Sequence, residues 1–158
     1  MGIFDLFKKK EWDTARSDAN KKKIRELFNA TVSDGDSYKI VYGYGLDITN
    51  TNFIIARKTT YEYTSLIIGY RESDMSILLL QTVPELDGCS EAQVFKKDDI
   101  KKSKMTLGMY TIYHQGGMMA GYTQFATVEG ADEKYLAYVY QPDEFKDFDA
   151  FFKKFSGK

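Results

Sequence analysis

The sequence is poor in the residue types from which most catalytic and metal-binding sites are built. It contains one histidine and one cysteine among 158 residues. One cysteine excludes an intramolecular disulfide, and one histidine with one cysteine supplies too few ligands for a common zinc site. His114 would need an activated nucleophile beside it, and the chain has no Gly-x-Ser-x-Gly motif. We therefore predict no catalytic residue, no metal and no cofactor.

Long apolar runs are also lacking. No stretch approaches the roughly 18 apolar residues that a membrane-spanning helix needs. The apolar residues near the N-terminus precede three lysines instead of following them, and they are fewer than the roughly 7–15 of a signal peptide. These features predict a cytoplasmic protein.

The net charge is small and unevenly distributed. Residues 1–25 hold eight Lys or Arg and four Asp or Glu, a net charge of +4, so residues 26–158 carry −5. Phosphate backbones are bound by concentrated basic surfaces, so an acidic body argues against nucleic acid as a partner. The basic N-terminal part favours an anionic contact or an ordinary solvated helix.

The chain reads as one short helix followed by many strands. Residues 17–30 have the spacing of an amphipathic helix, with Ser17 or Asp18 as its N-cap. Between residues 38 and 141, seven or eight β-rich segments, among them 52–61, 92–100 and 134–141, are separated by short turns, and no helical crossover lies between them. One of these segments, 104–114, alternates as a single strand would, with Met105 and Met109 on one face. This order predicts an antiparallel meander.

The C-terminal segment gives the strongest helix prediction. Pro142 suits the first helical position, and Asp143 and Glu144 follow in the first turn. Five phenylalanines recur at helical spacing and form one apolar face: Phe145, Phe148, Phe151, Phe152 and Phe155. Such a face requires a large apolar surface to pack against, so we expect the helix to close the core.

These elements predict one α+β domain. Its centre is a curved antiparallel sheet of seven or eight strands, with a leading helix and a C-terminal amphipathic helix. With two prolines and no Pro-rich linker, the chain offers no second domain. We place the domain at residues 13–158 and expect residues 1–12 to form a flexible or surface-docking N-terminal segment.

Two stretches give the chain a resemblance to a known superfamily. "VFKKDDIKKSKM" (94–105) and "YVYQPDEFKDFDAFFKKF" (138–155) are similar to bacterial members of the pleckstrin-homology-like superfamily, and the pattern extends over 38–156. The resemblance implies a roll in which two nearly orthogonal sheets are closed at one end by the C-terminal helix. It also implies binding of lipids or peptides, or a purely structural role. The chain departs from this pattern in its additional leading helix.

Three groups of residues are candidate contact sites. Met118 and Met119 lie at a predicted hairpin tip, where adaptable side chains could contact a partner or fold back over the core; Phe151 is the third candidate for a partner contact. Lysines near a strand entry could bind an anion, or could form a solvated loop beside Asp98 and Asp99: Lys101, Lys102 and Lys104. The N-terminus could meet an anionic membrane surface through Ile3, Phe4, Phe7, Lys8, Lys9 and Lys10.

We therefore predict a non-catalytic intracellular binding or adaptor module whose partner is a protein. The alternative is a peripheral membrane module, tethered at the inner membrane surface by residues 1–10 and binding an anionic lipid or another anion. An enzyme that uses carboxylate and tyrosine groups alone is the least favoured reading. Composition leaves the partner's identity and the oligomeric state open.

Overall fold

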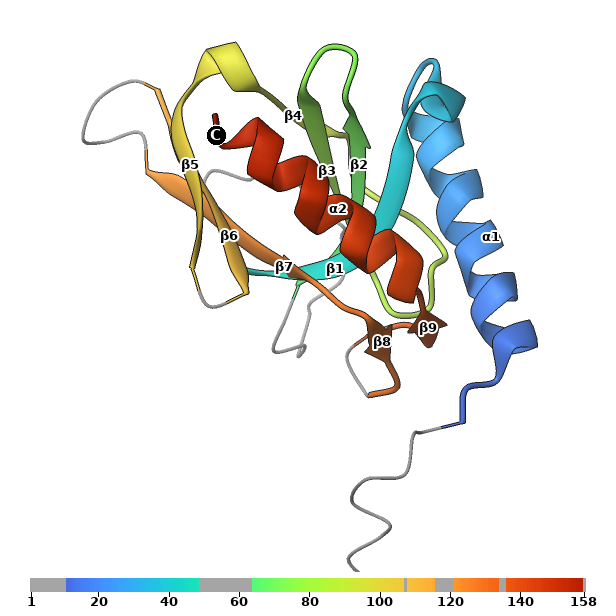
Figure 1. Cartoon of the computed structure of the whole chain (residues 1–158). Helices are drawn as coiled ribbons and strands as arrows, with labels where there is room; N and C mark the ends of the chain where they lie inside the picture. The colour runs from blue at the N-terminus through green and yellow to red at the C-terminus, as the bar shows by residue number, and fades with distance from the viewer. Residues whose placement is uncertain (1–10, 49–63, 107, 116–120, 134–135, 158) are drawn as a thin grey trace, which may run out of the picture.

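The structure, a computed structural model, describes residues 11–48, 64–106, 108–115, 121–133 and 136–157. In that part of the chain, two α-helices, nine strands and two short 3-10 turns are found (Figure 1). The elements follow one another as α1 (Thr14–Thr31), η2 (Gly35–Ser37), β1 (Lys39–Ile48), β2 (Thr64–Arg71), β3 (Ser76–Thr82), β4 (Gln93–Lys96), η3 (Lys97–Asp99), β5 (Ile100–Thr106), β6 (Met109–His114), β7 (Tyr122–Thr127), β8 (Gly130–Ala131), β9 (Val139–Tyr140) and α2 (Pro142–Phe155).

Seven strands form one curved antiparallel sheet that bends around α2 (Figure 1). Their order is β4-β3-β2-β1-β7-β6-β5, so β4 and β5 are its two edges. β1 joins the two halves because it pairs with both β2 and β7. β8 and β9 form a separate two-stranded sheet. The predicted α+β class, with its antiparallel curved sheet and two flanking helices, is confirmed.

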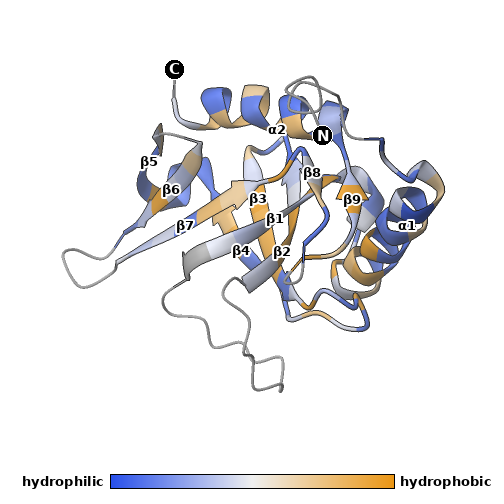
Figure 2. Cartoon of the chain, turned by 90° about the horizontal axis from the view of Figure 1, so that it is seen from below, coloured by the Kyte–Doolittle hydropathy of each residue, from blue (hydrophilic) through white to orange (hydrophobic). Residues whose placement is uncertain are grey.

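Helices cover both faces of the central strands. Successive residues of a strand point to opposite faces, and in β2 Ile67 and Ile68 are both fully buried for this reason. Ile68 belongs to the cluster that contains the α2 phenylalanines, whereas Ile67 packs with Ile24 and Phe28 of α1. Figure 2 shows the same arrangement as apolar colour on the central strands and on the side of α1 that faces them.

The C-terminal helix has the predicted boundaries and the predicted buried face. Pro142 occupies the first turn of α2. Asp143 and Glu144 lie in the same turn, where the helix macrodipole favours negative charge. The phenylalanines at the helical spacing are at most 4% exposed at four positions: Phe148, Phe151, Phe152 and Phe155. Their rings contact Tyr70, Tyr110 and Phe125 of the sheet, so α2 supplies one half of this core.

The first helix begins earlier than the sequence pattern predicted. It starts at Thr14, and the side chain of Asp13 caps it by accepting a hydrogen bond from the Arg16 amide at 3.0 Å. The predicted cap, Ser17, is buried inside the helix. Its hydroxyl bonds the backbone N–H and C=O of Tyr140 at 2.8 and 3.3 Å. Ser17 therefore joins α1 to β9, a tertiary role that the local sequence does not reveal.

Some of the predicted strands are divided differently in the structure. Residues 104–114 form two strands, β5 and β6, because the chain reverses around Gly108, whose φ of +80° suits glycine. Met109 therefore lies opposite Thr106 and does not share a strand face with Met105. The predicted strand 92–100 is interrupted by η3, and among the described residues of the predicted strand 134–141, which are 136–141, only Val139 and Tyr140 form a strand. The predicted strand 52–61 lies outside the described residues.

The predicted boundary between residues 12 and 13 falls within a packed contact. The indole of Trp12 stacks on Tyr140, with ring centroids 4.9 Å apart and an interplanar angle of 9°. The ring of Tyr138 lies 5.4 Å from the same indole. Trp12 therefore belongs to the folded domain. Residues 1–10 are outside the described part, so their expected behaviour stays a prediction.

We expect Trp12→Ala to lower the free energy of unfolding by about 1–2 kcal/mol, because the stacked contact and its buried area are lost. Removal of residues 1–10 alone should leave the urea midpoint unchanged. Urea titration followed by circular dichroism compares the two variants directly. Equal losses in both variants would show that the segment before Trp12 carries part of the core.

Candidate functional site

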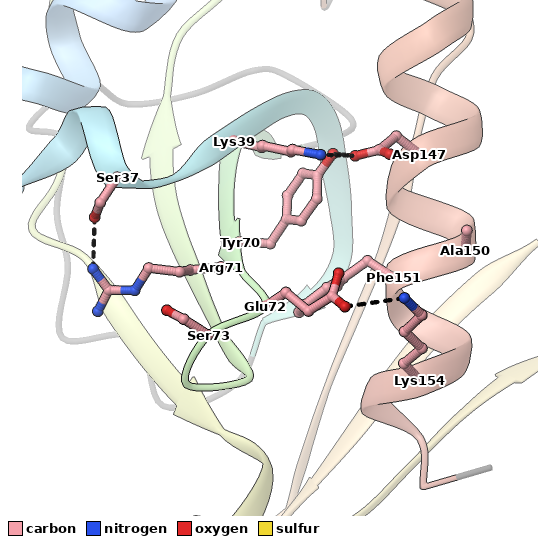
Figure 3. A pocket seen from close by; sticks show the side chains of 10 residues that line it. All are labelled: Ser37, Lys39, Tyr70, Arg71, Glu72, Ser73, Asp147, Ala150, Phe151 and Lys154. Atoms are coloured by element: carbon pink, nitrogen blue, oxygen red, sulfur yellow. Dashed lines mark hydrogen bonds and ion pairs between the residues drawn. The ribbon is translucent and has the colours of Figure 1, made fainter.

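A cleft runs between α2 and the adjoining ends of β1 and β2 (Figure 3). It consists of two hollows of about 360 and 420 Å³, which share Lys39, Tyr70 and Asp147. One hollow extends toward the β2–β3 turn and the C-terminal end of α2, and the other extends toward Arg25 of α1. Volumes of this size are typical of sites for small ligands or short peptide segments.

Asp147 stands at the junction of the two hollows. The Tyr70 hydroxyl donates to its Oδ2 at 2.6 Å, and the Lys39 ammonium lies 3.3 Å from the same oxygen. Burial raises the pKa of the Tyr70 phenol well above its ordinary value, and the bond to Asp147 raises it further. The same bond is the main cause of the lowered pKa of Asp147. At neutral pH the pair is a neutral phenol bonded to a carboxylate, so neither group is poised to accept a proton.

Arg71 forms the opposite wall and is held in place by several contacts. Its guanidinium donates two hydrogen bonds to the Asp74 carboxylate, at 2.8 and 3.1 Å, and a third to the Ser37 hydroxyl at 2.6 Å. It also lies 4.1 Å from the centroid of the Tyr38 ring. The Arg71 bond holds the pKa of Asp74 at about 2, so this carboxylate is ionised at neutral pH. Arg71 and Asp74 therefore neutralise each other.

Two exposed ion pairs border the hollow that reaches the C-terminal end of α2. Lys39 and Asp147 are 71% and 47% exposed, and Lys154 and Glu72 are 57% and 62% exposed at 3.0 Å. Pairs with such exposure contribute only about 0–1 kcal/mol each. A ligand that carries charges of its own could replace them at little cost.

The second candidate surface is the outer edge of the sheet at β5. In the described part of the chain, β5 pairs with β6 and with no other strand. The lysines that the sequence singled out lie along it and are called the lysine row below: Lys101, which falls at a register shift of the pairing with β6, and Lys102 and Lys104, which follow it. The ammonium groups of Lys102 and Lys104 lie 5.0 and 5.6 Å from the centroid of the Tyr113 ring. Asp98 and Asp99 precede the strand in η3, so they flank one end of the lysine row.

Of the other candidate contact residues, Phe151 lies in the described part of the chain and the rest lie outside it. Phe151 is a core residue that also lines the cleft, so packing accounts for its place on α2. Met118, Met119 and the N-terminal candidates, Ile3, Phe4, Phe7, Lys8, Lys9 and Lys10, lie outside the described residues. Their predicted contacts stay predictions.

The residues considered for catalysis have structural contacts. Nε2 of His114 lies 2.7 Å from the Thr123 hydroxyl, its ring packs edge-on against Phe95, and burial lowers the pKa of the imidazole. Cys89 lies 3.3 Å from the Thr31 hydroxyl. No metal-binding group of three or more His, Cys, Asp or Glu occurs among the described residues. In the same part of the chain, no helix is both long and apolar enough to cross a membrane.

Comparisons with known protein families, with curated proteins and with solved structures found no match to this chain. No activity, ligand or partner can therefore be carried over from a relative. Functional proposals for this protein therefore rest on the geometry of the β5 edge and of the cleft.

Sequence reasoning missed the cleft, and at β5 it singled out the lysines but not the strand edge on which they lie. The cleft joins Tyr70 and Arg71 to Asp147 and Lys154, which are far apart in the sequence, and no local pattern connects them. The one local signal is that Asp147 and Lys154 lie off the phenylalanine face of α2. The β5 lysines, in contrast, are neighbours in the sequence and form a visible cluster.

Proposed function

We propose that this protein is a non-catalytic binding module that pairs the edge of β5 with an extended, acidic segment of a partner protein. The observation that carries the proposal is the combination of a seven-residue strand at the edge of the sheet, as far as the described residues show, and three lysines along it. A cytoplasmic location is part of the proposal.

The backbone of β5 provides the first half of the recognition. An edge strand presents N–H and C=O groups on its unpaired side, and an added strand satisfies them without any particular side chain. The pairing of β5 with β6 is regular from Lys102 to Thr106, after a register shift between Ile100 and Lys102, so an added segment could pair over this five-residue stretch. Register would be selected by the side chains that alternate along the edge.

The lysines provide the second half. Edge lysines oppose pairing between two copies of the same strand, because like charges would face each other. An acidic segment would meet the opposite sign along the same edge. Residues 26–158 carry a net charge of −5, so this basic row is a local exception on an acidic body. Charge of this kind contributes to partner selection and to the rate of association.

The fold is consistent with a binding role. A curved antiparallel sheet closed by a C-terminal helix is compatible with the pleckstrin-homology-like roll that the sequence resembles. The superfamily includes lipid-binding, peptide-binding and structural members, so this likeness supports binding without selecting the ligand. The continuous pairing through β1 replaces the two separate sheets that the resemblance implies.

The alternative ligand is an anionic lipid surface. It is favoured by the same lysine row and by Met105, a large apolar side chain that is exposed on β5. An anionic leaflet attracts nearby lysines by about 1 kcal/mol each. The N-terminal tether on which this alternative also depends lies outside the described residues.

A peptide titration tests the proposal. An octapeptide that alternates glutamate and valine should bind, whereas the same peptide with lysine in place of glutamate should not. The double variant Lys102→Glu, Lys104→Glu should weaken binding by about tenfold or more, because two attractive charges become repulsive. The matched variant Lys22→Glu, Lys23→Glu changes the same charge on the exposed side of α1 and should have little effect.

Amide hydrogen exchange separates strand pairing from general charge attraction. Pairing should slow the exchange of backbone amides in β5, whereas a diffuse electrostatic contact would leave them unchanged. Vesicles that contain phosphatidylserine provide the lipid comparison. Binding to the vesicles without binding to the acidic peptide would favour the membrane alternative, and equal losses in both double variants would contradict the assignment to β5.

A further inference from the structure

We propose that the cleft beside α2 is a separate binding site for a short peptide with a free amino end and a free carboxyl end. This site lies on the β1 and β2 side of α2 and does not depend on the proposed strand pairing at β5. The proposal rests on the length of the cleft, on the order of the charges along it and on the weakness of the ion pairs that now occupy it (Figure 3).

The length of the cleft matches about three residues of extended chain. Asp147 and Lys154 are seven positions apart on α2, which corresponds to about 10 Å along a helix axis. An extended tripeptide also spans about 10 Å. The hollow between the two residues has a volume of about 360 Å³, which lies within the range of sites for ligands of this size.

The charges along the cleft are arranged for a ligand that is positive at one end and negative at the other. Because Arg71 is neutralised by Asp74, the remaining charges of the hollow between Asp147 and Lys154 come from Lys39, Asp147, Glu72 and Lys154 and sum to zero. Along α2 the carboxylate of Asp147 comes first and the ammonium of Lys154 last. A zwitterion along the helix can pair its amino end with Asp147 and its carboxyl end with Lys154. A polyanion or a polycation would be repelled at one end.

The present ion pairs can give way to such a ligand. Lys39 and Glu72, the current partners of Asp147 and Lys154, have side chains that are mostly exposed and can turn into solvent. Asp147 would keep its position, because the buried Tyr70 hydroxyl remains bonded to it. The Ser73 hydroxyl also lines this hollow, whereas the Ser37 hydroxyl is already bonded to Arg71 and to the Asp34 carbonyl.

The other side of α2 supplies matched control positions. Asp149 accepts a hydrogen bond from the Tyr110 hydroxyl at 3.0 Å, as Asp147 does from Tyr70, and Lys153 lies 3.2 Å from it. Neither residue lines the cleft. The variants Asp149→Asn and Lys153→Gln therefore make the same chemical changes as Asp147→Asn and Lys154→Gln at positions outside the proposed site.

Titration with trialanine tests the proposal, with N-acetyl-trialanine amide as the uncharged probe. Trialanine should shift the backbone NMR signals of Ala150 and Phe151 in a saturable manner, and the blocked peptide should not. Asp147→Asn and Lys154→Gln should each weaken binding by about fivefold, the equivalent of about 1 kcal/mol, because one charged contact is lost. The two control variants should bind trialanine as the unchanged protein does. A check of the urea midpoint establishes that each variant is folded.

Several results would overturn the proposal. Trialanine could fail to bind in a saturable manner, or the blocked peptide could bind as well as the free one. Equal weakening by Asp149→Asn and Lys153→Gln would place the contact away from the cleft. None of these results bears on the β5 proposal, because the acidic peptide is tested on a different surface with different variants.

Discussion

Replacing Phe148 or Phe152 by alanine should lower the free energy of unfolding by about 3–5 kcal/mol, through lost burial and the cavity that remains. Both rings are at most 1% exposed. Phe148 lies 5.1 Å from the Tyr70 ring and 5.0 Å from the Tyr110 ring, measured between centroids, and Phe152 lies 4.6 Å from Tyr110. A domain of this size has a total stability of about 5–15 kcal/mol, so either variant could lose much of it.

Urea titration measures the loss, and Phe145→Ala serves as the control. Phe145 lies on the same helix but is only partly buried, so its replacement should cost clearly less. Size-exclusion chromatography should accompany the titration. A variant that keeps its stability but changes its association state would show that the phenylalanine face is a contact surface between molecules. The assignment of these rings to the core would then be wrong.

The success of the α2 prediction has a local cause. The spacing of the phenylalanines, Pro142 and the charged residues in the first and last turns all lie within 14 residues, so each signal is independent of the rest of the fold. The same holds for β2 and β3, which contain the apolar runs Leu66–Ile68 and Ile77–Leu80. What these signals could not predict is which helix covers which face, because that depends on pairing between distant strands.

The errors also have physical causes. The pattern of 104–114 alternates through Gly108, and glycine is compatible both with a strand and with the reversal that occurs there. Ser17 is a favourable N-cap residue, but its hydroxyl bonds β9, and Asp13 caps the helix. In both cases a tertiary contact or a turn competes with a local preference that is real but weak.

The cleft depends on contacts that the sequence cannot specify locally. Tyr70 reaches Asp147 across 77 positions, and Tyr110 reaches Asp149 across 39. In the sequence, the two aspartates read only as the polar side of an amphipathic helix. In the fold, the hydroxyls of the two core tyrosines bond these aspartates on either side of the phenylalanine face. The two bonds fix the rotation of α2 about its own axis. This rotation determines which charged residues of the helix border the cleft.

The second large effect is expected at Gln141, the residue that precedes α2. Its side chain is 3% exposed, and its amide oxygen accepts a hydrogen bond from the Tyr42 N–H at 3.0 Å. Its amide nitrogen donates to the carbonyl oxygens of Tyr42, at 2.8 Å, and Val128, at 2.6 Å. The β1–β7 register ends at Gly43, and beyond it the Val128 N–H donates to the Tyr42 carbonyl at 3.3 Å, so Gln141 adds bonds to β1 at the point where the regular pairing ends.

Gln141→Ala should therefore lower the free energy of unfolding by about 3–4 kcal/mol, since the Tyr42 N–H and the Val128 carbonyl lose their bonds to Gln141 at about 1–3 kcal/mol each. Gln141→Met should cost nearly as much, because it restores the volume but neither accepts nor donates comparable hydrogen bonds. Gln115→Ala is the control, since Gln115 is exposed and bonds a single carbonyl.

Urea titration gives the stability of the Gln141 variants, and amide exchange at Tyr42 reports the local contact. Exchange at Tyr42 should accelerate in both Gln141 variants and stay unchanged in Gln115→Ala. If Gln141→Met were as stable as the unchanged protein, shape alone would explain the site. The side chain would then fill space without holding α2 to β1, and the position of the helix would depend on the phenylalanine face and the two tyrosine–aspartate bonds.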